Sequence, residues 1–95
     1  MAFDFRNERR KGILELVAMQ EYGVLYSRKE KLKRISAEMV SEGGSEIGIC
    51  LNDINKCLDV LNYGMTTWLE MYNRLSGEDY SDTKFEMMLK RKGYI

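Results

Sequence analysis

The stretch from Ile47 to Leu75, IGICLNDINKCLDVLNYGMTTWLEMYNRL, carries the most regular pattern in the sequence. Its apolar residues recur at alternating spacings of four and three residues from the first to the last. This spacing places one apolar stripe along a helix that packs lengthwise against another helix, so a helix is predicted over about residues 45–75. The stripe consists of Ile47, Leu51, Ile54, Leu58, Leu61, Met65, Trp68, Tyr72 and Leu75.

The residues beside this stripe carry no charge. A two-stranded coiled coil normally places Glu and Lys on these flanks. Small neutral flanks instead let helices approach on both sides, which favours a helical bundle over an isolated pair. One flank holds Cys50, Cys57, Gly64 and Met71, and the other holds Gly48, Asn55, Asn62 and Leu69.

Residues 4–41 are predicted to form another long helix. The chain contains no proline, and the Gly43-Gly44 pair provides the turn between the two helices. Gly23 lies inside the first helix, where glycine costs about 1 kcal/mol relative to alanine, so a bend or break there is the alternative. The heptad repeat that supports this helix consists of Ala18, Leu25, Leu32 and Met39.

A short C-terminal helix is predicted over about residues 82–92. Ser81 or Asp82 suits its N-cap, and Gly93 suits the position after its C-cap. Its apolar face is formed by Phe85, Met88 and Leu89. The sequence therefore predicts an all-α fold in one domain of residues 1–95. That fold is an antiparallel hairpin of two long helices plus a short C-terminal helix, and it assembles into a multi-helix bundle.

Charge and composition set the expected environment. The 15 basic and 15 acidic residues of this 95-residue chain cancel, and no apolar run approaches the roughly 20 residues that span a bilayer, so no membrane partner is expected. Residues 1–40 carry +3, residues 41–82 carry −6 and residues 83–95 carry +3, which is consistent with an antiparallel hairpin. Two cysteines are too few for a disulfide scaffold, and we expect a reduced, cytoplasmic protein.

No catalytic or cofactor-binding motif is evident, and we expect a protein that is not an enzyme. The absence of histidine removes the commonest general base and the commonest metal ligand, and no cofactor or metal is expected. Cys50 and Cys57 are about 10.5 Å apart along one helix, too far for a disulfide within the chain. The favoured interpretation is that both are small core residues, and the alternative is a reactive thiol or a bridge between chains.

The length of the predicted helix over residues 45–75 indicates self-association. It extends for about 46 Å, whereas a compact chain of this size has a diameter of roughly 30 Å. We therefore expect a homodimer or higher homo-oligomer, with a different protein that supplies the missing helices as the alternative. The residues expected to form the oligomer interface are Leu51, Ile54, Leu58, Leu61, Met65, Trp68 and Tyr72.

These patterns predict a non-enzymatic protein-protein interaction module that acts as a homo-oligomer. An adaptor, a regulator or an inhibitor fits this description. Small helical proteins of this kind are found in phages and mobile elements. The alternative is binding to nucleic acid or a nucleotide through the basic first helix. Arg28, Lys31 and Arg34 are the expected contacts to a partner or to phosphates.

Overall fold

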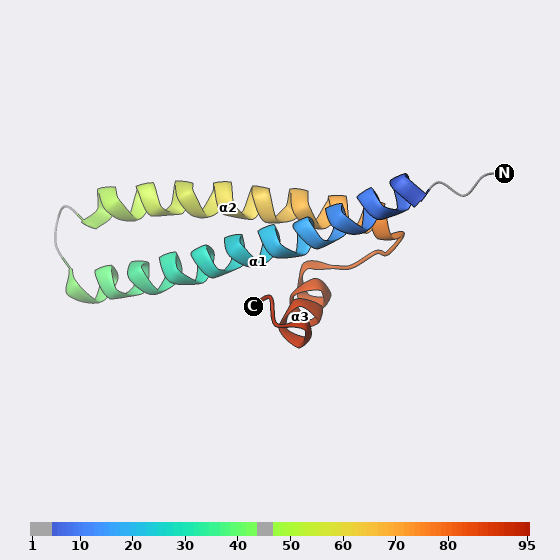
Figure 1. The fold of residues 1–95 in the computed structure, drawn as a ribbon. Coiled ribbons are helices and arrows are strands. Elements are labelled where there is room, and N and C mark those ends of the chain that lie inside the picture. Colours follow the sequence, from blue (N-terminus) through green and yellow to red (C-terminus); the bar gives the residue numbers. More distant parts are fainter. Residues whose placement is uncertain (1–4, 44–46) are drawn as a thin grey trace.

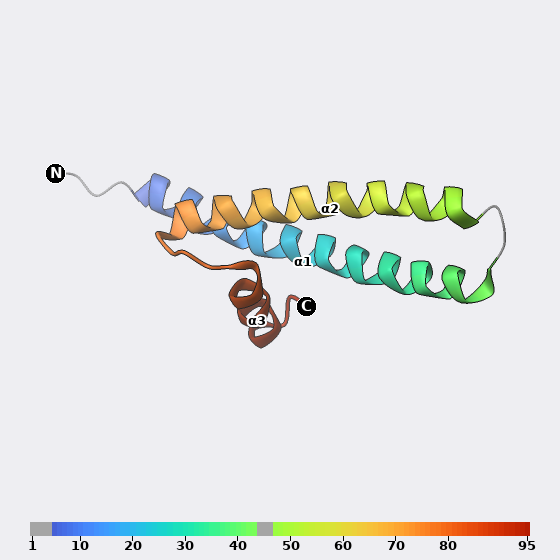
Figure 2. The same ribbon diagram turned by 180° about the vertical axis from the view of Figure 1, so that it is seen from behind.

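The computed structural model describes residues 5–43 and 47–95, and within these ranges it contains three helices (Figure 1). α1 spans Phe5–Glu42, α2 spans Ile47–Ser76 and α3 spans Asp82–Lys92. α1 and α2 lie antiparallel along their length, and α3 packs against one side of this hairpin (Figure 2). The predicted all-α fold of two long helices and a short third helix is therefore confirmed. The predicted helix starts at residues 4 and 45, and Gly44 of the predicted turn, lie outside the described residues.

α1 runs without a break through Gly23, so the alternative of an interrupted helix is not observed. Gly23 is buried, and a Cβ atom at this position would lie 2.9 Å from the carbonyl oxygen of Tyr94. The missing side chain thus lets the C-terminal residues approach the backbone of α1. The glycine serves a close contact here, not a bend.

Both ends of α3 are capped by the residues that the sequence predicts. The Ser81 hydroxyl accepts a hydrogen bond from the backbone N–H of Lys84 at 3.3 Å. Gly93 has a φ of +86°, and the N–H groups of Gly93 and Tyr94 donate to the carbonyls of Lys90 and Leu89. Glycine adopts this left-handed conformation at no steric cost.

The segment before α3 is fastened to α2 through one asparagine. The Asn73 side-chain amide donates to the Tyr80 carbonyl at 3.0 Å, and the Tyr80 N–H donates to Asn73 Oδ1 at 2.9 Å. A helix of 11 residues is too short to be stable alone, so these bonds and the apolar contacts below determine where α3 lies.

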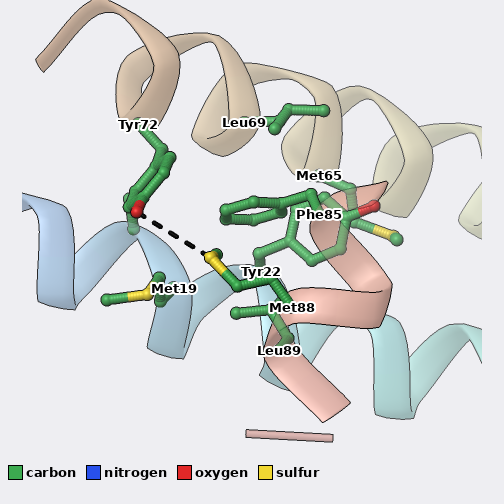
Figure 3. Packing of buried hydrophobic residues seen from close by; sticks show 9 residues of the cluster. Met19, Tyr22, Met65, Leu69, Tyr72, Phe85, Met88 and Leu89 are labelled. Atoms are coloured by element: carbon green, nitrogen blue, oxygen red, sulfur yellow. Dashed lines mark hydrogen bonds between the residues drawn. The ribbon is translucent and has the colours of Figure 1, made fainter. Parts of the chain in front are cut away.

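The buried core lies where all three helices meet, and Phe85 of α3 is at its centre (Figure 3). The Phe85 ring lies 4.9 Å from the ring of Tyr22 on α1, edge to face, and 4.9 Å from the ring of Tyr72 on α2. Such aromatic pairs contribute beyond the area that they bury. The buried residues are Ala18, Met19, Tyr22, Met65, Leu69, Tyr72, Phe85, Met88 and Leu89.

The rest of the hairpin extends beyond this core as a pair of helices. We call residues 13–26 and 62–76 with α3 the three-helix end, and residues 27–42 and 47–61 the two-helix end. The radius of gyration is 17.4 Å, against roughly 12 Å for a compact chain of this length. At the two-helix end the described apolar residues between the helices, such as Leu32 and Leu58, are only half-buried.

Candidate interaction surface

α3 covers one flank of the hairpin and leaves the opposite flank uncovered. Asn62 of α2 and Asp82 of α3 line the same small cavity, and Leu69 belongs to the core, so α3 lies against the flank that holds Asn62 and Leu69. Cys57 lies on the other flank of the stripe and is exposed. We call this second flank of the hairpin, formed by α1 and α2 on the side of Cys57 and Gly64, the open face.

A groove of about 570 Å³ lies on the open face at the two-helix end. Its apolar lining includes two exposed side chains, Ile35 at 36% and Val60 at 71% exposure. An apolar concave surface with this exposure is typical of an interaction site. The complete lining is Arg28, Lys31, Leu32 and Ile35 of α1 with Lys56, Cys57, Val60 and Leu61 of α2.

The groove combines an apolar lining with three cations. The long side chains of Arg28 and Lys31 come from α1, and that of Lys56 comes from α2. Such side chains cover apolar surface with their stems while the charged ends stay in water. The groove therefore suits an apolar ligand surface that carries negative charge at its margin.

The open face continues along α1 toward the three-helix end. Leu14 and Val24 are exposed, and Leu14, Glu21, Arg28 and Ile35 follow one another at seven-residue intervals. Residues seven apart lie two turns apart on nearly the same side of a helix. The exposed apolar surface is therefore a band along the hairpin, and the groove is its deepest part.

The residues predicted for the oligomer interface have mixed positions. Met65 and Tyr72 are buried in the chain's own core, and Leu61 contributes to the groove. The remaining ones, Leu51, Ile54, Leu58 and Trp68, are half-buried along the hairpin. Contacts within the chain thus already occupy much of the stripe, and exposed apolar surface is found beside it.

Two of the three basic residues predicted as partner contacts come together on the groove. Arg28 and Lys31 line it, whereas Arg34 is exposed and is not among its lining residues. Val60 and Lys56 also line the groove, although the sequence patterns do not single them out. Val60 could have been found as a large apolar side chain at an outward position of the heptad, where a solvated helix normally has a polar one.

The cysteines differ from their favoured interpretation. Both Cys50 and Cys57 are exposed and unpaired thiols, whereas small core residues would be buried. Neutral side chains on both flanks of the stripe predict that neighbouring helices cover both flanks. Within one chain α3 covers only the other flank, which is why these two thiols face solvent.

Tyr22 is the most perturbed titratable group among the described residues. Its buried hydroxyl lies 3.1 Å from Asp82 Oδ1 and 3.0 Å from Glu86 Oε1, and its single proton can be donated to one carboxylate at a time. Burial, and then the nearby Glu86 and Asp82, raise the pKa of Tyr22 far above its usual value of 10.0. The hydroxyl therefore stays protonated and joins α1 to α3, a structural role.

Metal binding and membrane insertion find no support in the part of the chain that the structure describes. Across residues 5–43 and 47–95, no three or more Cys, Asp or Glu side chains gather in a way that could hold a metal ion. Among the same residues, no helix has a segment apolar and long enough to cross a bilayer.

Comparison of the chain with protein-family models, with curated proteins and with solved structures gives no match.

Proposed function

We propose that this chain is a non-enzymatic interaction module, of the adaptor, regulator or inhibitor type, that works as a homo-oligomer through its open face. The observation that carries this proposal is the apolar groove between Ile35 and Val60, which no part of the described chain covers. Burying such surface contributes about 25 cal/mol per Å², so an assembly that covers it is favoured.

A second copy of the chain is the proposed occupant because the open face carries both signs of charge. Arg28 and Lys31 flank the groove, and Glu21 lies two turns from Arg28 in the direction of the three-helix end. A second copy brings the same acidic and basic groups, so each copy supplies the charge that the other lacks. The commonest soluble oligomers are dimers with this kind of self-complementary contact.

Two valine substitutions test the proposal. Val60→Glu places a carboxylate on the open face, and the expected result is a fall in mass toward that of the single chain in sedimentation equilibrium. Val40→Glu is the matched control. Val40 is exposed at 62% and is not among the residues that line the groove. It lies fourteen residues after Tyr26, which packs against the core that α3 completes.

Val40→Glu should leave the mass unchanged, and circular dichroism should show that both variants keep their helices. Equal masses for the two variants and the unmodified chain would contradict the proposal.

The second candidate function is binding of nucleic acid, and the convergence of Arg28, Lys31 and Lys56 on one groove favours it. Contacts to phosphates release counterions, so binding should weaken steeply as salt concentration rises. Titration of a labelled single-stranded RNA and a duplex DNA at low salt measures this. Flat titrations with both would remove the candidate, as would binding that Lys31→Glu leaves unchanged.

A further inference from the structure

The charges on the open face alternate in sign along the hairpin. Next to the turn lie the acidic Glu38 and Asp53, and the basic Arg28 and Lys31 of the groove follow. The acidic Glu21 comes next, and the basic Arg10 and Arg74 lie at the opposite end. These charges belong to three rows of residues spaced at seven-residue intervals. The first row, on α1, is Arg10, Val17, Val24, Lys31 and Glu38, and the second row, also on α1, is Leu14, Glu21, Arg28, Ile35 and Glu42. The third row, on α2, is Asp53, Val60, Thr67 and Arg74.

These charges are free to meet another molecule. All the charged members of the three rows are exposed. Members of one row are at least about 10 Å apart along the helix, which is too far for ion pairs within a row. The ion pair found in the described part of the chain joins Lys33 to Glu30 at 3.7 Å, and neither residue belongs to these rows.

Each row brings residues of opposite charge together when its direction is reversed. In the first row, reversal places Arg10 over Glu38, Val17 over Lys31 and Val24 over its own copy. In the second row, reversal about the midpoint of Glu21 and Arg28 places Glu21 over Arg28 and Leu14 over Ile35, and Glu42 lies beyond the paired members.

On α2, reversal places Asp53 over Arg74 and Val60 over Thr67. One opposite-charge pair therefore meets in each of the three rows, and like charges do not meet within a row. Apolar pairs form in the two rows of α1, whereas Val17 meets Lys31 and Val60 meets Thr67.

The centres of the rows coincide in space. The midpoint about which the rows reverse lies near Val24 on α1 and near Gly64 on α2. A Cβ atom at Gly64 would lie 3.0 Å from Cδ1 of Leu25, the neighbour of Val24 in sequence, so both midpoints lie at the same level of the hairpin. A single two-fold axis can thus satisfy α1 and α2 together.

We infer that the open face binds a second copy of the chain in antiparallel register, with the two-fold axis crossing the hairpin at Val24 and Gly64. This deepens the proposed self-association, on which it rests, by specifying orientation and register. The product is a four-helix bundle in which α1 lies on α1 and α2 on α2.

Other occupants fit the charge pattern less well. A second copy in parallel orientation would place the basic pair Arg28 and Lys31 at the level of the same pair, which costs energy. A uniformly acidic helix would match this pair but would oppose Glu21 and Glu38 with like charge. The alternating pattern is therefore specific for a partner that has the same pattern reversed.

A charge exchange tests the register. Arg28→Glu places two carboxylates opposite each other twice in the dimer and should weaken dimerisation about tenfold. Adding Glu21→Arg restores the pairs in reversed order and should return the dimerisation constant to that of the unmodified chain. The two positions are two turns apart, so the exchange creates no ion pair within one chain.

Cysteine cross-linking tests the axis in a Cys50→Ser, Cys57→Ser background. Val24→Cys should form a disulfide-linked dimer on mild oxidation, because the inferred axis brings residue 24 beside its copy. Val40→Cys, with a more exposed side chain, is the control and should stay monomeric under the same conditions.

The outcomes separate the inference from the proposed function. A dimer by mass in which Val24→Cys fails to cross-link and the charge exchange fails to restore assembly overturns the register while self-association stands. A mass of one chain at every concentration overturns both.

Discussion

The three-helix end and the two-helix end of this molecule bury their apolar residues by different means. At the three-helix end, α3 completes a core in which Tyr22, Phe85 and Leu89 are fully buried. At the two-helix end no third helix of the described residues packs on the hairpin, and Val60 and Ile35 stay exposed beside a groove. The comparison teaches that a helix pair leaves much of its apolar surface exposed unless a further helix packs on it.

The largest expected effect is at the centre of the core. Phe85→Ala removes a side chain with no exposed surface that contacts both Tyr22 and Tyr72, and should cost about 3–5 kcal/mol. Urea unfolding followed by circular dichroism measures this loss. Met87→Ala, on the exposed side of the same helix, should cost less than about 0.5 kcal/mol. A similar loss for the two variants would show that α3 does not dock as described.

The second prediction compares two leucines of α2. Leu69→Ala at the three-helix end should cost about 2–5 kcal/mol, because the side chain is only 7% exposed. Leu58→Ala at the two-helix end should cost roughly half as much in a dilute, dissociated sample, because its side chain is only half-buried. Equal losses in free energy of unfolding would remove the difference between the two ends.

The third prediction concerns the bond between α1 and α3. Tyr22→Phe removes the hydroxyl that bonds Asp82 and Glu86 and should cost about 1 kcal/mol. Because folding raises the pKa of Tyr22, its contribution to stability is fully present below pH 10 and declines as the pH rises further. Tyr63→Phe changes an exposed tyrosine and is the control.

Thermal unfolding between pH 8 and 12 should therefore show a smaller decline at high pH for Tyr22→Phe than for the unmodified chain. Tyr72, whose pKa burial also raises, contributes to the decline that remains. Identical pH profiles for Tyr22→Phe and the unmodified chain would contradict the role given to this hydroxyl.

The smallest expected effects come from two glycines of α1. Gly12→Ala meets no atom within 4 Å and should stabilise the chain by about 0.5–1 kcal/mol through helix propensity. Gly23→Ala must displace the Tyr94 carbonyl, which would lie 2.9 Å away, so this gain should be lost or reversed. Thermal melting points that rise equally would show that the C-terminal residues do not pack on α1.

The fold could be predicted because its signals are local. The stripe of α2, the break after α1 and the caps of α3 each depend on neighbouring residues. The position of α3 could not be predicted, because it depends on Phe85 meeting Tyr22 and Tyr72 across the fold. Because the position of α3 is unknown at that stage, the sequence does not show which flank of the hairpin stays uncovered. Val60 and Lys56 are therefore not recognised as residues of the groove. Arg28 and Lys31 were found because basic residues cluster in the sequence itself.

The mass of the unmodified chain in solution tests the central claim most directly. Sedimentation equilibrium over a dilution series should give twice the chain mass of 11.1 kDa at high concentration and should approach the single-chain value on dilution. A mass of 11.1 kDa throughout, with helical content retained, would show that the open face is stable uncovered and would contradict the account.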